Sequence, residues 1–111
     1  MEKKAALESL SALAHDIRLD VLRLLVRAGP PGLTAGEIAA ALDIRANTLS
    51  NNLGILTVVG LVRSEREGRS IRYFAQMETM RDLLAFLLED CCGGRPEMCQ
   101  PLLDELTSCK C

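Results

Sequence analysis

The sequence predicts a mainly α-helical domain that carries one small β-hairpin. Apolar residues recur at helical spacing along most of the chain, and one arginine-rich stretch has short β-type segments on both sides of a glycine. With 111 residues, 49% of them hydrophobic, the chain has the size and composition of a single globular domain. Its core must be aliphatic, because the chain has no Trp, one Tyr and two Phe.

Two amphipathic helices are expected at the N-terminal end. In the segment 3–15, apolar residues recur at helical spacing at Leu7, Leu10, Leu13 and Ala14. In the segment 16–29, they share one face at Ile17, Val21, Leu24 and Leu25. The second helix should end at residues 29–32, Gly-Pro-Pro-Gly, because glycine accepts the left-handed cap conformation and proline cannot continue the helix.

A pair of helices joined by a tight turn follows. Thr34 and Glu37 have the spacing of a capping box and start a short helix that should end near Asp43. A second helix should run from about Arg45 to Val59. Its apolar stripe consists of Leu49, Leu53 and Leu56, widened by Ile55 and Val59, and its other face shows Asn47, Ser50, Asn51 and Gly54.

A hairpin and a long helix are expected next. Leu61-Val62 and Ile71-Tyr73-Phe74 flank a charged stretch with Gly68 near its middle, which indicates two short strands. From about Met77 a helix with a wide apolar stripe should reach Cys91-Cys92 and break at Gly93-Gly94, and a further helical fragment should follow Pro101. A helix–turn–helix unit followed by a hairpin is the winged helix-turn-helix arrangement.

The charge distribution of this unit indicates DNA binding. The chain has a formal net charge of −2, but residues 45–72 carry five arginines against two glutamates. The start of the second helix gathers polar residues that form helices poorly, although asparagine can bridge an adenine edge and Ser or Thr can bond bases or phosphates. A surface helix with a solvated polar face is the alternative. We expect DNA contacts at Arg45, Asn47, Thr48, Ser50 and Asn51.

The hairpin supplies four arginines within ten residues: Arg63, Arg66, Arg69 and Arg72. Charged hairpin tips are often only solvated, and Glu65 and Glu67 can neutralise part of this set. In a chain with little other positive charge, the arginines suit a wing that touches phosphates or enters the minor groove. Arg66 and Arg69 are the favoured contacts, with Arg72 as a further candidate.

Four segments together resemble the arsenic-repressor (ArsR/SmtB) family of metal-sensing winged-helix repressors, over about Leu10 to Leu88: "HDIRLDVLRLL", "TAGEIAAAL", "NTLSNNLGILTVVGLV" and "REGRSIRYFAQ". The resemblance implies a homodimer through the first and last helices. It also implies binding to an inverted repeat in double-stranded operator DNA without inducer, and release when inducer binds. The chain departs from the family at Arg45, where a Ser cap is common, and at "SNNL", where "SHHL" is common.

The thiols of this chain lie away from the sensing positions common in that family. The stretch Glu37–Leu42 has no cysteine, and the single histidine, His15, is expected to have a structural role at a helix start or interface. All five cysteines fall after residue 90, which divides the chain into a winged-helix domain (1–90) and a cysteine-rich tail (91–111). A family variant with a vicinal cysteine pair and a third, later cysteine is similar to this tail. The inducer As(III) or Sb(III) is therefore assigned to Cys91, Cys92 and Cys99, because soft thiolates select soft ions.

Other readings of the tail stay open. The cysteines can form a zinc or cadmium site, or a redox switch that oxidises to a disulfide. A small thiol metal carrier without DNA binding is a further alternative, and Cys109 and Cys111 have no assigned role. No catalytic constellation is evident, so neither an enzyme nor an organic cofactor is expected. Without a signal peptide or a long apolar span, we expect a cytoplasmic protein with no membrane partner.

Overall fold

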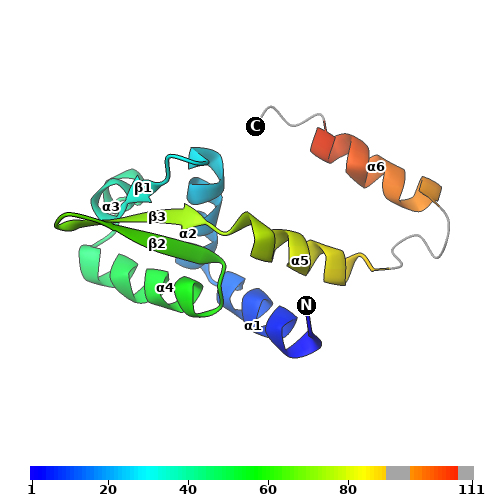
Figure 1. The fold of residues 1–111 in the computed structure, drawn as a ribbon, viewed down its shortest axis with the longest axis horizontal. Coiled ribbons are helices and arrows are strands. Elements are labelled where there is room, and N and C mark those ends of the chain that lie inside the picture. The colour runs from blue at the N-terminus through cyan, green and yellow to red at the C-terminus, as the bar shows by residue number, and fades with distance from the viewer. Residues whose placement is uncertain (90–95, 108–111) are drawn as a thin grey trace.

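The computed structural model describes residues 1–89 and 96–107 (Figure 1). In chain order its elements are α1 (Lys3–Leu13), α2 (Asp16–Ala28), β1 (Leu33–Thr34), α3 (Ala35–Leu42), α4 (Ala46–Val58), β2 (Val62–Glu67), β3 (Ser70–Ala75), α5 (Met77–Leu87) and α6 (Pro96–Thr107). This order confirms the predicted helix–turn–helix unit, formed by α3 and α4, and the predicted wing, formed by β2 and β3. No helix in the part of the chain that the structure describes is long and apolar enough to span a membrane.

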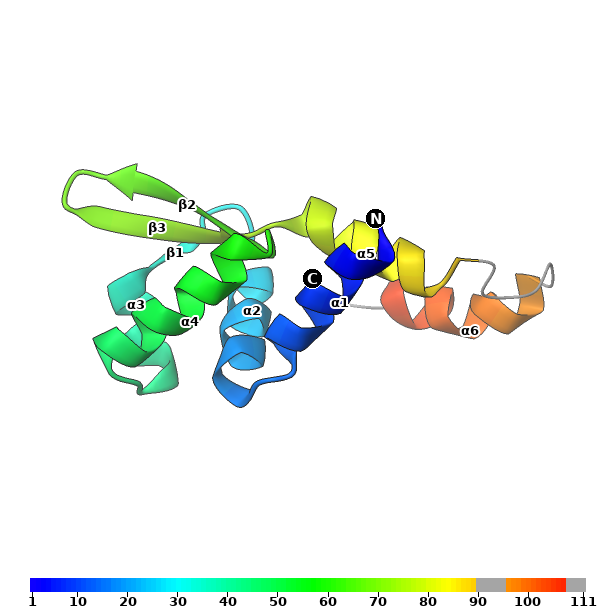
Figure 2. The same cartoon turned by 90° about the horizontal axis from the view of Figure 1, so that it is seen from below.

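The wing belongs to a three-stranded antiparallel sheet with the order β1-β3-β2. Its hairpin pairs Val62 with Ala75 at the base and Glu67 with Ser70 at the end. Gly68 has a φ of 60° at the first of the two turn residues, the conformation that glycine gives to a type II′ hairpin turn. Figure 2 shows this hairpin projecting past the helices. The third strand, β1, was not predicted, because two residues are too short to show an alternating pattern.

The core lies between α2, α3, α4 and the base of the wing. The predicted stripe of α4 is confirmed at Leu49, Leu53 and Leu56, which are each no more than 1% exposed, and at Val59, which is partly buried against the core. Ile55, predicted to widen the stripe, is instead 37% exposed. They pack with Val21, Leu22, Leu25, Ile38, Leu61 and Val62. The predicted face of α2 is also largely confirmed, with Ile17 and Leu24 packed against the core as partly buried residues. These contacts hold α4 against the rest of the domain by one face and leave its other face to solvent.

The outer helices expose part of their apolar stripes. On α1 the side chains that pack inward are small, namely Ala6, Ser9 and Ala12, whereas Leu7 and Leu10 are 56% and 38% exposed. On α5 only Leu83 is buried, and Leu84, Leu87 and Leu88 are between 38% and 49% exposed. These two helices therefore present apolar surface that the described chain does not cover.

Two helix boundaries at the C-terminal end differ from the prediction. The last long helix was expected to reach Cys91-Cys92, but α5 ends at Leu87 with Leu88 as its C-cap. Acidic residues follow, Glu89 and Asp90, and negative charge is unfavourable at a helix C-terminus. The final helix was expected after Pro101, but α6 begins at Pro96 and contains Pro101. Proline at the first helical position is favourable because its missing N–H has no intrahelical acceptor there.

Candidate nucleic-acid interface

The tight turn before α4 depends on one left-handed residue. Asp43, the C-cap of α3, has φ 52° and ψ 52°, and the chain turns from α3 to α4 within three residues, 43–45. The predicted capping box at the start of α3 is confirmed: the Glu37 N–H donates to Thr34 Oγ1 at 3.2 Å, and the Thr34 N–H donates to Glu37 Oε1 at 2.9 Å. These local interactions fix where α3 begins and ends, and so set how α4 lies relative to it.

The polar residues of α4 divide into two groups. Arg45, Asn47, Ser50 and Asn51 are exposed, and Thr48 is half-buried. Asn52, which the sequence interpretation did not single out, is only 5% exposed. A signal for its burial was present, because Asn52 lies three residues after Leu49 and four before Leu56 and so belongs to the apolar stripe. The polar face available to a ligand is therefore formed by the first group.

Asn52 joins α4 to the N-terminal helices. Its Oδ1 accepts a hydrogen bond from Arg18 Nη1 at 3.3 Å, and its Nδ2 donates to the Thr48 carbonyl at 2.9 Å. Arg18 also donates through Nε to the Ala12 carbonyl at 2.6 Å. A chain of hydrogen bonds thus runs from the end of α1 through α2 to α4, and Asn52 has a structural role.

The four arginines of the wing have different surroundings. Arg63 forms an ion pair with Glu65 at 2.7 Å, and its guanidinium carbon lies 4.2 Å from the centroid of the Phe74 ring. Arg66 and Arg69 are exposed and form no ion pair within the described residues. These two arginines, the favoured contacts of the sequence interpretation, carry the uncompensated positive charge of the hairpin.

Arg72 connects the wing to the start of α3. It forms ion pairs with Glu67 at 2.7 Å and Glu37 at 3.7 Å, and donates to the Pro31 carbonyl at 3.2 Å. The hydrogen bond to Glu67 raises the pKa of Arg72, and the hydrogen bonds with Thr34 lower the pKa of Glu37. Arg72 is thus tied within its own chain, and its contact with DNA stays a prediction.

The structure brings α4 and the wing to one shared surface. A hollow of about 490 Å³ is lined by residues from α3, from α4 and from the hairpin, including Ser50 of α4 and Arg69 of the wing tip. Two residues predicted to contact DNA from different elements therefore border the same space. A helix that enters a DNA groove beside an arginine-bearing hairpin requires this adjacency.

The predicted inducer site is described only at Cys99. Cys91 and Cys92 lie outside the described residues, as do Cys109 and Cys111. Cys99 is on α6, is half-buried and is disulfide-bonded. Within residues 1–89 and 96–107 no group of three or more His, Cys, Asp or Glu side chains is placed to hold a metal ion. The expected helix-start position of His15 is confirmed, since it is the N-cap residue of α2.

The chain is similar in sequence to known transcriptional regulators. A family model described as a helix-turn-helix domain matches residues 13–65. The chain is 34% identical over 86 residues to the HTH-type transcriptional regulator YgaV of Escherichia coli, across 78% of this chain and 83% of that protein. It is 40% identical over 75 residues to the biofilm growth-associated repressor of Agrobacterium fabrum, across 66% of this chain and 62% of that protein. The structure of an ArsR-like transcriptional regulator from Rhodococcus sp. RHA1 has a similar fold, with a TM-score of 0.68 at 24% identity over 93% of this chain and 92% of that one.

Proposed function

The chain belongs to a family of helix-turn-helix transcriptional regulators with the fold of ArsR-type proteins, and from this premise we propose that it is an arsenite-responsive repressor. It binds operator DNA as a homodimer and leaves the DNA when thiolates of the tail bind As(III) or Sb(III). The observation that carries the DNA-binding part is the shared surface of α4 and the wing, where Ser50 and Arg69 border one hollow.

The proposed DNA contacts are the exposed polar and basic residues of α4 and the wing. Asn47, Ser50 and Asn51 are exposed on the first two turns of α4 and suit base edges in the major groove. The Asn47 Oδ1 also accepts a hydrogen bond from the Thr48 N–H at 2.9 Å. Arg66 and Arg69 suit phosphates, because no carboxylate within the described residues neutralises them. Arg45, the N-cap residue of α4, makes no side-chain capping bond and is exposed beside these groups.

The homodimer is supported by the apolar surface of the outer helices. Leu10 of α1 and Leu84, Leu87 and Leu88 of α5 are all at least 38% exposed, and Figure 2 shows α1 and α5 lying together. Exposed apolar side chains grouped on neighbouring helices are typical of a protein–protein interface. A two-fold dimer through these helices would present two copies of α4 to successive major grooves, about 34 Å apart.

The inducer site is proposed at Cys91, Cys92 and Cys99. As(III) and Sb(III) are soft ions, and thiolates are the softest ligands that a protein offers. The ion can release DNA only through its different affinities for the DNA-bound and free forms. A 100-fold weakening of DNA binding corresponds to about 2.7 kcal/mol of coupling free energy.

A redox-sensing repressor is the second candidate, and the state of Cys99 favours it. Cys99 is disulfide-bonded, and a sulfur in a disulfide is not available as a thiolate ligand. The Cys99 sulfur could then be oxidised in a disulfide or bound to arsenite, but not both at the same time. The two candidates differ in which reagent releases the DNA.

Substitution of the three proposed ligands tests the site. We expect Cys91→Ser, Cys92→Ser and Cys99→Ser each to raise the arsenite concentration for half-release of promoter DNA at least tenfold, measured by fluorescence anisotropy under a thiol reductant. Cys111→Ser serves as the control from the same tail. If all three variants release DNA at wild-type arsenite concentrations, the site is wrong. Release by diamide but not by arsenite supports the redox candidate instead.

A further inference from the structure

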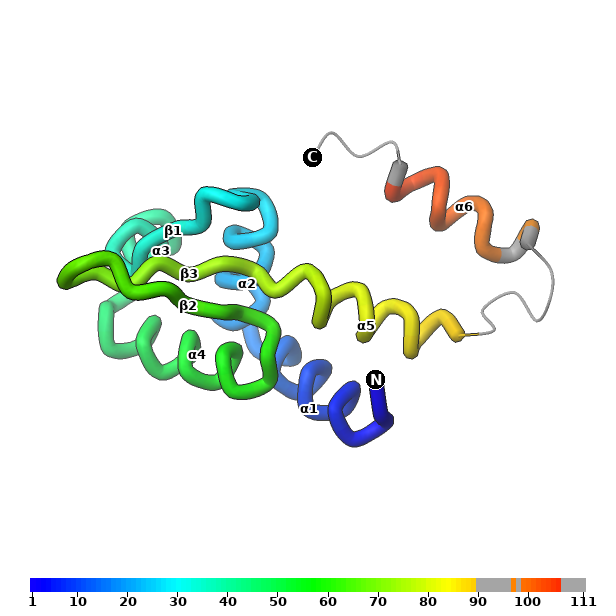
Figure 3. Tube along the Cα trace, in the orientation of Figure 1, coloured from blue at the N-terminus to red at the C-terminus, as the bar shows by residue number. Residues whose placement is uncertain are grey.

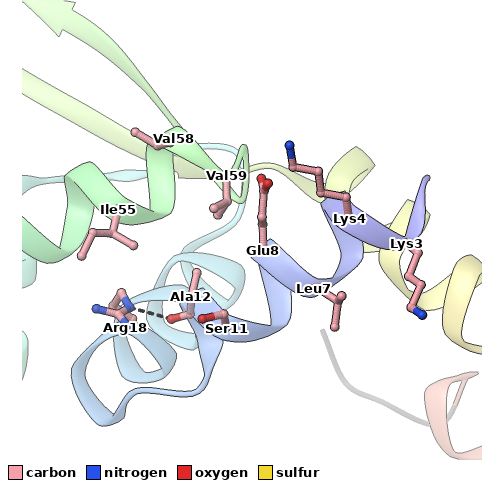
Figure 4. A pocket seen from close by; sticks show the side chains of 10 residues that line it. All are labelled: Lys3, Lys4, Leu7, Glu8, Ser11, Ala12, Arg18, Ile55, Val58 and Val59. Carbon is pink, nitrogen blue, oxygen red and sulfur yellow. Dashed lines mark hydrogen bonds between the residues drawn. The ribbon is translucent and has the colours of Figure 1, made fainter.

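An open apolar groove lies between α1 and the C-terminal half of α4. Its volume is about 810 Å³, and its apolar lining includes Leu7 of α1 and Ile55 and Val58 of α4 (Figure 4). These residues are 56%, 37% and 86% exposed. An almost fully exposed valine beside two other large apolar residues indicates a surface that another segment covers.

The helix α6 carries an apolar stripe of its own. Cys99, Leu102, Leu103 and Leu106 follow the i, i+3, i+4, i+7 spacing that places side chains on one helix face. The three leucines are 42%, 49% and 57% exposed. An amphipathic helix of this pattern is suited to lie with its stripe in an apolar groove.

The charges of the groove and of α6 are opposite. The groove is lined by three basic side chains, Lys3, Lys4 and Arg18, and by one acidic side chain, Glu8, which gives +3 − 1 = +2. The helix α6 carries three acidic residues and no basic one, since its sequence is PEMCQPLLDELT, which gives −3. Opposite net charge favours the approach of α6 to this groove over other apolar surfaces.

We propose that α6 of a second copy of the chain docks in this groove. In the orientation of Figures 1 and 3, α5 is drawn between α6 and α1. Within the described residues α6 does not pack extensively against α1 or α4, so the groove is not filled by α6 of the same chain. The docking rests on the proposed homodimer, because the two chains must already be held together by their outer helices.

The groove has a direct connection to the DNA-binding helix. Ile55 and Val58 belong to α4 itself, and Arg18 in the groove donates to Asn52 of α4 at 3.3 Å. Cys99 is the first residue of the docking stripe. A docked α6 would contact α4 directly through Ile55 and Val58 and would lie beside Arg18, which gives the tail of one chain a route to the DNA-binding helix of the other.

Photocrosslinking of the full-length chain tests this docking. Val58 is replaced by p-benzoylphenylalanine. The protein is irradiated in the presence of a thiol reductant and run on a reducing gel, so that disulfide-linked dimers do not contribute. We expect a covalent dimer in which mass spectrometry maps the crosslink to residues 97–107. The matched control carries the crosslinker at Ile71, a wing residue that is 41% exposed, and should give at least fivefold less of this product. Three results would overturn the proposal: a crosslink within one chain, a crosslink to α1 or α5 of the second copy, or a yield of the 97–107 product no higher than with the crosslinker at Ile71.

Two variants check that the stripe makes the contact. Leu103→Gln should lower the crosslink yield at least fivefold, whereas Glu97→Asp, which lies on the opposite face of α6 and keeps the negative charge, should leave the yield within twofold of wild type. Equal effects of the two variants overturn the proposal. Sedimentation velocity of the same samples separates the two levels of inference: a monomer refutes the proposed homodimer, whereas a dimer without the 97–107 crosslink refutes only the docking of α6.

Discussion

Alanine at Asn51 and at Asn52, made one at a time, should separate a DNA-binding asparagine from a structural one. The two residues are adjacent on α4, but Asn51 is exposed and Asn52 is 5% exposed. We expect Asn52→Ala to destabilise the fold and Asn51→Ala to weaken DNA binding. Both variants replace asparagine by alanine in the same helix, so the change in helix propensity is the same in each. It therefore cancels when the unfolding free energies of the two variants are compared.

The expected loss of stability in Asn52→Ala follows from the two hydrogen bonds that Asn52 makes. One comes from the charged Arg18 at 3.3 Å, and one goes to the Thr48 carbonyl at 2.9 Å. A bond to a charged group contributes about 1.5–3 kcal/mol and a neutral bond about 1 kcal/mol. Arg18 is only half-buried, so water can replace part of its lost partner, and alanine regains about 0.5 kcal/mol of helix propensity. We therefore expect a net loss of about 1–2 kcal/mol.

Urea unfolding followed by far-ultraviolet circular dichroism measures this loss, since the chain has no Trp to report by fluorescence. Asn51→Ala should stay within about 0.5 kcal/mol of wild-type stability and lower affinity for promoter DNA by about 1–3 kcal/mol in an anisotropy titration. Equal destabilisation by the two variants would refute the structural role of Asn52. Wild-type affinity of Asn51→Ala would remove Asn51 from the DNA contacts.

Three further predictions concern the wing and its support. Arg69→Ala should reduce the slope of log K against log salt by about 1 in anisotropy titrations, because one phosphate contact is lost; an unchanged slope removes Arg69 from the phosphate contacts. Gly32→Ala should cost more than about 2 kcal/mol in urea unfolding, because Gly32 has φ +60° and an added Cβ would lie 2.5 Å from the Tyr73 carbonyl oxygen. Gly68→Ala, with the same φ but nothing within 4 Å, should cost about 1 kcal/mol; equal losses would contradict the steric argument. The pKa of Glu37 is lowered from its ordinary value of 4.5, so the ionised carboxylate stabilises the fold above that pH, and the contribution is lost as pH falls through the lowered value. Urea midpoints between about pH 5 and pH 3 should therefore fall more steeply for wild type than for Glu37→Gln, which keeps a side chain able to form the capping box; parallel curves would show that the ionisation of Glu37 does not couple to stability.

The helix–turn–helix unit and the wing were predictable because their signals are local. The capping box of Thr34 and Glu37 marks the start of α3, and the spacing of Leu49, Leu53 and Leu56 identifies the buried face of α4. The strand β1 and the contacts of Arg72 with Pro31 and Glu37 were not predictable in this way, whereas its pair with Glu67 agrees with the expected neutralisation within the hairpin. Arg72 donates to a carbonyl at Pro31, 41 residues earlier in the chain, and no periodic pattern contains a pairing at that separation.

The candidate site was predictable in its residue types but not in their division of roles. The polar cluster of α4 indicated a ligand-binding face, yet only the structure separates the exposed Asn51 from Asn52, which is bonded to Arg18. For the tail, the cysteines predict a soft-ligand site, but their spacing alone does not predict how the three sulfurs lie relative to one another. The prediction for Cys91, Cys92 and Cys99 accordingly depends on the substitutions proposed above.

The amphipathic stripes of α1, α5 and α6 show what a sequence pattern leaves undetermined. Periodicity identifies an apolar face, but the same pattern arises whether the chain itself or a second copy covers that face. In this protein Val21 and Leu25 of α2 and Leu49, Leu53 and Leu56 of α4 are covered within the chain. Leu10, Leu84 and Leu103, by contrast, stay at least 38% exposed. In the proposed homodimer, an effector that binds the tail would act on helices whose packing is completed by the second copy. Through its different affinities for the DNA-bound and free forms, it would change the spacing of the two copies of α4 without changing either winged helix internally. A change of that spacing would release α4 from two successive major grooves.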